Sequence, residues 1–117
     1  MEVIKIYEGE TKTENIKECL NLIIKLDFTL KSYGNKYLRT YTVLGETLLK
    51  LKSFNKKKYK NLLEVNKINY SVSYIDALIR ISKLVSNHPS ILYFSVSIHF
   101  FNKHYKDIKE LCIKNSW

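Results

Sequence analysis

The fold is decided by residues 55–85, which read NKKKYKNLLEVNKINYSVSYIDALIRISKLV. The first part of this stretch has a partial apolar stripe at helical spacing, formed by Tyr59, Leu62, Leu63 and Val65. It predicts a helix over about residues 56–65, followed by a polar turn over residues 66–70. A second helix then begins at Ser71 or Ser73, because either hydroxyl can cap free backbone N–H groups. Two helices joined by a short turn have the outline of a helix-turn-helix.

The second of these helices has two chemically different sides. One side is mostly apolar and suits a core: Val72, Ile75, Leu78, Ile79, Ser82 and Val85. The other side is small and polar at its start and basic further on: Ser73, Asp76, Ala77, Arg80 and Lys83. A helix that reads DNA needs short side chains where its backbone approaches the groove and long cations that reach phosphate or guanine. A solvated outer face of any helical domain has the same pattern, so both interpretations stay open.

Composition favours one mainly α-helical domain. The 117 residues are enough for one core of normal size and too few for two. Three glycines and one proline argue against a loop-rich β-sandwich. We therefore expect residues 1–117 to form a single compact bundle of about five helices, with the helix-turn-helix at residues 55–85 and short extended segments near residues 2–7 and 93–98.

Three further helices are predicted outside the central stretch. The first follows a capping box formed by Thr11 and Glu14 and ends before Tyr33. The second covers about residues 36–53, with Gly45 inside it as a point of close packing. Beyond Pro89, which ends the preceding helix, we expect a short helical turn, an extended piece and a final helix over residues 98–114.

The net charge of +9 is unevenly distributed along the chain. Codon usage in an A+T-rich genome also produces a chain rich in Lys, Ile, Asn and Tyr, so the total charge is ambiguous. The distribution is more informative, because residues 36–60 contain eight Lys and Arg residues and one acid, Glu46, a balance of 8 minus 1, or +7. A concentrated basic patch indicates binding to phosphates or to an anionic membrane surface.

Motifs of enzymes, cofactor sites and metal sites are missing from the sequence. There is no Gly-rich phosphate loop, no Gly-x-Ser-x-Gly and no Cys or His pair at a zinc-site spacing, so we expect neither an enzyme nor a bound cofactor. Cys19 and Cys112 are far apart among apolar neighbours, which favours buried free thiols in a reducing compartment. The apolar runs are too short for a membrane span, and the acidic N-terminus does not resemble a signal peptide.

A family resemblance adds to this interpretation. Residues 44–84, with LGETLLKLK followed by YKNLLEVNKINYSVSYIDALIRISKL, resemble the helix-turn-helix segments of small DNA-binding proteins of phages and large DNA viruses. The likeness covers about a third of the chain. Lys67 stands where that motif usually has a glycine, and the turn is a residue or two longer. The resemblance implies DNA reading by one face of the second helix, formed by Ser71, Ser73, Tyr74, Ala77, Arg80 and Lys83.

The sequence thus predicts a small basic DNA-binding protein that acts as a viral or mobile-element regulator. The DNA contacts are assigned to the reading face named above and to four lysines, Lys56, Lys57, Lys58 and Lys60. A homodimer is expected, because one short helix seldom supplies enough specific contact and because residues 91–117 hold more apolar side chains than one terminal helix needs. The expected location is the cytoplasm or nucleus of an infected host cell. The alternative is a helical viral factor that engages a host or viral protein and has no nucleic-acid role.

Overall fold

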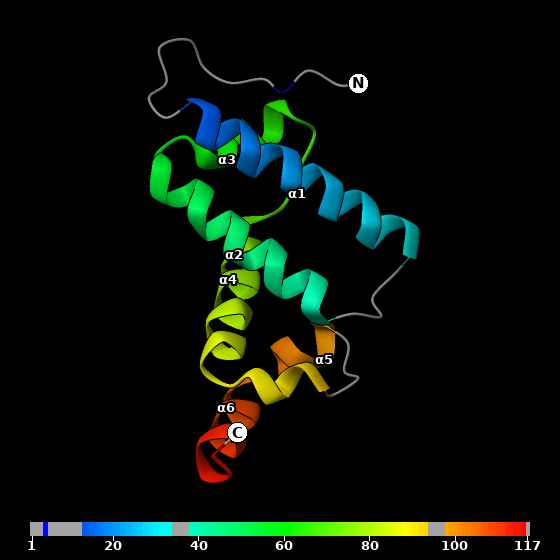
Figure 1. Ribbon diagram of the computed structural model, residues 1–117, viewed down its shortest axis with the longest axis vertical. Coiled ribbons are helices and arrows are strands. Elements are labelled where there is room, and N and C mark those ends of the chain that lie inside the picture. The colour runs from blue at the N-terminus through cyan, green and yellow to red at the C-terminus, as the bar shows by residue number, and fades with distance from the viewer. Residues whose placement is uncertain (1–3, 5–12, 34–37, 94–97, 117) are drawn as a thin grey trace.

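The computed structural model describes residue 4 and residues 13–33, 38–93 and 98–116 (Figure 1). These residues form the helices α1 (Thr13–Tyr33), α2 (Leu38–Phe54), α3 (Tyr59–Val65), α4 (Val72–Asn87), the 3-10 helix η1 (Pro89–Tyr93), α5 (Ile98–Lys103) and α6 (Tyr105–Lys114). The prediction of a mainly α-helical bundle is confirmed. Its expected segments near residues 2–7 and 93–98 lie largely outside the described residues, as does the Thr11 side of the proposed capping box.

Two adjacent helices, α1 and α2, form one layer, and α4 crosses behind α2 (Figure 1). The apolar positions of α1 recur every three to four residues and are buried: Ile16, Cys19, Leu20 and Ile23. They meet Leu44, Leu48 and Leu51 of α2 and Ile75, Leu78 and Ile79 of α4 in the larger of two buried clusters. Burial of side chains of this size stabilises a fold by about 1.5–3 kcal/mol each, so this cluster is the main source of stability.

The crossing of α2 and α4 depends on Gly45. A methyl group at this position would overlap the backbone carbonyl of Leu78 and come within 3.1 Å of the Ser82 side chain. The hydroxyl of Ser82 donates to the carbonyl oxygen of Ile79 at 2.7 Å, so the small polar side chain is satisfied within its own helix. The predicted close-packing role of Gly45 is therefore confirmed, and α4 is held against α2 rather than chiefly against α3.

A second buried cluster lies at the other end of the molecule, toward the C-terminus (Figure 1). It is built from Leu38, Ile81, Leu84, Val85, Ile91, Phe101 and Cys112. Since α4 contributes Ile79 to the first cluster and Ile81 to the second, it is the element that joins the two. The result is an elongated molecule of 48 × 28 × 20 Å.

Several helix boundaries and faces differ from the sequence-based predictions. Helix α3 begins at Tyr59 and not near residue 56, because residues 55–58 form a turn in which the Lys58 N–H donates to Asn55 Oδ1 at 3.1 Å. The final helix is interrupted at His104, whose φ of −110° and ψ of 21° leave the helical region, so the helix predicted over residues 98–114 is two helices, α5 and α6. Val65 and Val72, assigned to apolar faces, are 42% and 48% exposed.

Candidate nucleic-acid interface

The turn before α3 presents three consecutive lysines to solvent. Lys56, Lys57 and Lys58 are exposed and form, with Asn55, what we call the lysine turn. Among the residues that the structure describes, no carboxylate lies within ion-pair distance of Lys56 or Lys57. Lys60, on the first turn of α3, is instead engaged by Glu64 at 2.8 Å. Positive charge is therefore concentrated in the lysine turn, directly before α3.

Lys52 connects the lysine turn to α4. Its Nζ lies 3.9 Å from Asp76 Oδ1 on α4 and 5.6 Å from the centroid of the Tyr59 ring, which directly follows the lysine turn. Asp76 is thereby paired with Lys52 and not with Arg80, one turn further along α4. Because Tyr59 directly follows the lysine turn, the end of the turn and the start of α4 border the same face around Lys52.

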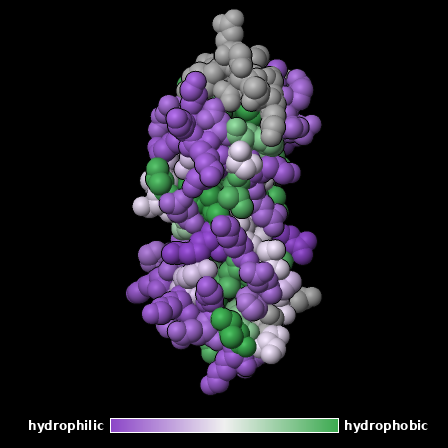
Figure 2. All heavy atoms as spheres, turned by 90° about the vertical axis from the view of Figure 1, so that its left-hand side faces the viewer, coloured by the Kyte–Doolittle hydropathy of each residue, from purple (hydrophilic) through white to green (hydrophobic). Residues whose placement is uncertain are grey.

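The exposed stripe of α4 continues this face. It is formed by residues spaced three to four apart, namely Ser73, Asp76, Arg80, Lys83 and Asn87. We define the basic face as Lys52, Lys56, Lys57, Lys58, Arg80 and Lys83, which together with Asp76 have a balance of six minus one, or +5. Figure 2 views the molecule from the side on which α2 ends and shows that hydrophilic residues cover most of that side.

Arg80 lies against an aromatic ring, that of Tyr105 at the start of α6. The guanidinium carbon lies 4.4 Å from the centroid of the Tyr105 ring, a distance at which a cation and an aromatic face attract each other. No ion pair involving Arg80 occurs within the described part of the chain. The arginine is thus oriented by an aromatic ring, while its hydrogen-bond donors are not occupied by a carboxylate.

The start of α4 is fixed by Ser71 and by two tyrosines. The Ser71 hydroxyl accepts a hydrogen bond from the Tyr74 N–H at 3.1 Å, so Ser71 is the N-cap and Ser73 is an exposed residue of the first turn. Tyr70 donates its hydroxyl proton to Asp27 Oδ1 on α1 at 2.6 Å, and Tyr74 packs edge-on against Tyr70 with ring centroids 5.0 Å apart. Both rings pack on the first buried cluster. Tyr74 and the half-buried Ala77 therefore border the predicted reading face and do not project from it.

These contacts shift the pKa values of both tyrosines. Burial, together with the hydrogen bond to Asp27, raises the pKa of Tyr70 well above its ordinary value. Burial also raises the pKa of Tyr74 to about 12. The two phenols are consequently protonated at neutral pH and act as structural donors and packing groups.

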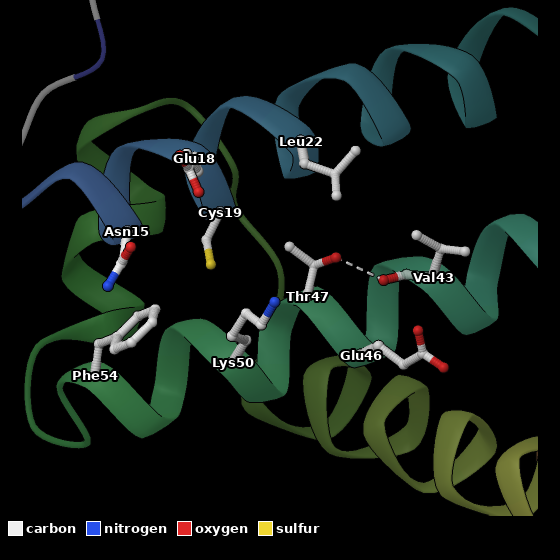
Figure 3. A pocket seen from close by; sticks show the side chains of 9 residues that line it. All are labelled: Asn15, Glu18, Cys19, Leu22, Val43, Glu46, Thr47, Lys50 and Phe54. Carbon is white, nitrogen blue, oxygen red and sulfur yellow. Dashed lines mark hydrogen bonds between the residues drawn. The ribbon is translucent and has the colours of Figure 1, made fainter. Parts of the chain in front are cut away.

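A groove between α1 and α2 has a volume of about 620 Å³ (Figure 3). Its lining mixes apolar side chains, such as Leu22 and Phe54, with the charged groups of Glu18, Glu46 and Lys50. The Cys19 thiol points into it (Figure 3), but burial raises its pKa more than the nearby Lys50 ammonium lowers it. A thiol of raised pKa is a poor nucleophile, so the groove has no evident reactive group.

Metal binding and membrane spanning find no support in the described residues. No cluster of three or more His, Cys, Asp or Glu side chains there could hold a metal ion. In the same part of the chain no helix is both long enough and apolar enough to cross a bilayer. Cys19 and Cys112 are both buried and unbridged, as their sequence contexts predicted.

Comparison with protein-family models, with curated proteins and with solved structures finds no match to this chain. The resemblance to helix-turn-helix proteins stays a prediction. One feature of the turn supports this resemblance, and another argues against it. Lys67, at the place of the usual glycine, adopts a positive φ of 66°, the left-handed conformation that glycine favours. Yet six residues, 66–71, connect α3 to α4, more than the usual turn of about 3–4 residues.

Proposed function

We propose that this protein binds duplex DNA through the basic face, with the lysine turn on the phosphate backbone and the outer stripe of α4 toward the major groove. The observation that supports this proposal is the double contact of Lys52 with Asp76 on α4 and with the ring of Tyr59, because it brings the end of the lysine turn close to the start of α4. Basic side chains on adjacent elements can follow neighbouring phosphates, whereas lysines spread over the whole molecule cannot.

Duplex DNA is favoured over single strands by the positions of the tyrosines. Proteins that hold single strands stack the bases on exposed aromatic rings. Tyr59 and Tyr41, which lie near the lysines in sequence, are only 7% and 3% exposed, and Tyr70 and Tyr74 pack on the first buried cluster. Among the described residues near the lysine turn, positive charge is not accompanied by an exposed tyrosine ring, which suits a backbone whose bases are already stacked.

Helix α4 would approach the groove with α2 behind it. Its outer stripe starts with Ser73, which like the N-cap Ser71 is short, and continues to Arg80 and Lys83, which are long and cationic. In this arrangement the lysine turn positions the protein without regard to sequence, and Arg80 is the side chain able to read a guanine by a bidentate contact. Asp76, between them, would repel phosphate but is partly neutralised by Lys52.

We also propose a homodimer that uses the apolar side chains left exposed on α5 and α6. Phe100 and Leu111 are each 47% exposed and Ile113 is 62% exposed, although all three are large and apolar. Pairing of these helices in two copies would cover them and would present two α4 helices to two half-sites. Light scattering over a wide concentration range should show a dimer, and a monomer throughout would remove the two-half-site version of the proposal.

A binding role toward another protein is the second candidate. It is favoured by Phe28 on α1, which is 68% exposed, and by the same apolar residues of α5 and α6. Two observations argue against a protein-binding role. Phe101 is fully buried, and Tyr105 is half-buried beneath Arg80. Most of the described aromatic rings of the C-terminal third therefore pack in the second buried cluster. We therefore rank DNA binding first.

The deciding experiment is fluorescence anisotropy with a short labelled duplex of mixed sequence, measured over a series of salt concentrations. We expect the logarithm of the binding constant to fall linearly with the logarithm of the salt concentration, by about 0.9 for each phosphate neutralised. The matching labelled single strand should bind more weakly at every salt concentration. No binding to the duplex at low salt, or equal binding to both probes, would refute the proposal.

A further inference from the structure

The contact between Arg80 and Tyr105 joins the basic face to α6, which the sequence did not connect with that face. Arg80 is on the exposed stripe of α4, and Tyr105 is the first residue of α6. The guanidinium carbon is 4.4 Å from the ring centroid. Tyr105 itself packs on the second buried cluster, as does its neighbour along the helix, Ile108. The ring is therefore a fixed support under a side chain that would otherwise sample many rotamers.

A contact with an aromatic ring and an ion pair differ in how many N–H donors of the arginine they leave available. A carboxylate partner would occupy the N–H donors of the guanidinium, and DNA would have to displace it. An aromatic ring contacts the flat face of the guanidinium and leaves the donors at its edge for another acceptor. The only nearby acid on α4, Asp76, is paired with Lys52 at 3.9 Å, so it does not compete for Arg80. The arrangement holds the arginine in one orientation and keeps its donors ready for an external anion.

We infer that Tyr105 is a positioning residue, which presents the Arg80 guanidinium to a phosphate or a guanine of bound DNA. This inference rests on the proposed DNA binding and adds α6 to the machinery of the basic face. It implies that α6 contributes to the affinity for DNA although Tyr105 itself does not touch the DNA. The benefit is preorganisation, because a side chain already held in its bound orientation loses less conformational entropy on binding.

A double-mutant cycle on duplex binding tests this role. Tyr105→Leu should weaken binding by about two- to fivefold, the range expected for an exposed cation–π contact. Tyr105→Phe, which keeps the ring, should bind as the parent does. In an Arg80→Ala background the Tyr105→Leu change should have no further effect, because the ring then has nothing to position. Equal effects of Tyr105→Leu in both backgrounds would show a merely structural role and overturn the inference.

Two additional measurements separate the ways in which the test can fail. The NMR signals of the Arg80 δ and ε protons should be shifted upfield by the ring in the free parent protein and should return toward ordinary values in Tyr105→Leu. This readout needs no DNA, so it tests the contact even if the parent protein does not bind a duplex and the proposed function fails. If thermal unfolding shows that Tyr105→Leu is not folded, Tyr105→Met replaces it in the cycle. Parent-like affinity of the folded ring-free variant refutes the positioning role.

Discussion

The two turns that flank α3 differ in how they are held. The lysine turn, residues 55–58, has three exposed lysines and is held by local contacts. Asn55 accepts from the Lys58 N–H at 3.1 Å and from the Tyr59 N–H at 3.0 Å, and its own N–H donates to the Leu51 carbonyl at 3.4 Å. The turn after α3, residues 66–71, we call the anchored turn. It buries Ile68, hydrogen-bonds Tyr70 to Asp27 on α1, and caps α4 with Ser71.

The backbone of the anchored turn is also closed by a specific pattern of hydrogen bonds. The Lys67 N–H donates to the Glu64 carbonyl at 3.0 Å, and the Ile68 N–H donates to the Leu63 carbonyl at 2.9 Å. This is the Schellman arrangement, in which a residue of positive φ ends a helix. The comparison teaches that the anchored turn, which resembles part of a DNA-binding motif, mainly connects α3 to α4, whereas the lysine turn is the accessible charged surface. Substitutions in the two turns should therefore affect different properties.

The largest effect on stability should come from Tyr70→Phe. Asp27 is only 8% exposed and receives one hydrogen bond from Tyr70 and one ion pair from Lys31 at 2.9 Å. Loss of the phenol leaves a nearly buried carboxylate oxygen without that partner, which should lower the free energy of unfolding by about 1–3 kcal/mol. Urea unfolding measures this. Tyr59→Phe is the matched control and should change stability by less than about 0.5 kcal/mol, because its hydroxyl makes no hydrogen bond to the described residues.

The anchored turn should also make the fold sensitive to alkaline pH. The pKa values of Tyr70 and Tyr74 are raised in the folded state, that of Tyr74 to about 12, while a tyrosine in the unfolded chain titrates near about 10. Their contribution to stability is thus fully present below about pH 10 and is lost as the pH rises through the folded-state values. Urea unfolding at increasing pH should show this loss, and Tyr70→Phe should make it shallower. An unchanged pH profile in Tyr70→Phe would contradict the assignment.

Much of this architecture follows from local sequence signals, for physical reasons that are visible at particular residues. Periodic apolar side chains located α1 and α2, and the missing side chain of Gly45 indicated the close crossing. Ser71 and Ser73 were both recognisable as candidate caps because capping involves only neighbouring residues, and the structure has Ser71 as the N-cap. Pro89 marked the end of α4 because its ring restricts the residue before it.

The parts that could not be predicted depend on contacts between distant segments. Nothing local distinguishes Lys52 from the other lysines, and its link to Asp76 exists only because α4 crosses α2. Arg80 and Tyr105 are 25 residues apart, so their contact follows from the second buried cluster and not from either helix alone. Tyr74 was assigned to the reading face by the family resemblance, but its ring packs against the Tyr70 ring and on the first buried cluster.

A smaller effect, in the stabilising direction, is expected from Lys67→Gly in the anchored turn. The φ of 66° at Lys67 strains a residue with a Cβ by about 1–2 kcal/mol, whereas glycine accepts it freely but gains about 0.5–1 kcal/mol of backbone entropy in the unfolded chain. The net gain should be about 0.5–1 kcal/mol by urea unfolding. Asn61→Gly, at an exposed helical position of α3, is the control and should lose about 0.3 kcal/mol, because asparagine is itself a weak helix former. Destabilisation by both substitutions would mean that Lys67 is not strained.

The smallest effect on stability, but the clearest on binding, should come from the lysine turn. Replacing Lys56, Lys57 and Lys58 with glutamine removes three exposed cations and should change the free energy of unfolding by less than about 0.5 kcal/mol. The salt dependence of duplex binding should become shallower, by about 0.9 for each phosphate that the protein no longer neutralises, and affinity should fall equally for all DNA sequences.

The matched control replaces three exposed lysines of α6, Lys106, Lys109 and Lys114, and lowers the net charge equally, from +9 to +6. If both triple variants show the same drop in affinity and the same salt slope, binding follows total charge, and the lysine turn has no special place on the basic face. A drop confined to the first variant would localise the phosphate contacts to the turn before α3, while the anchored turn after α3 keeps only its structural role.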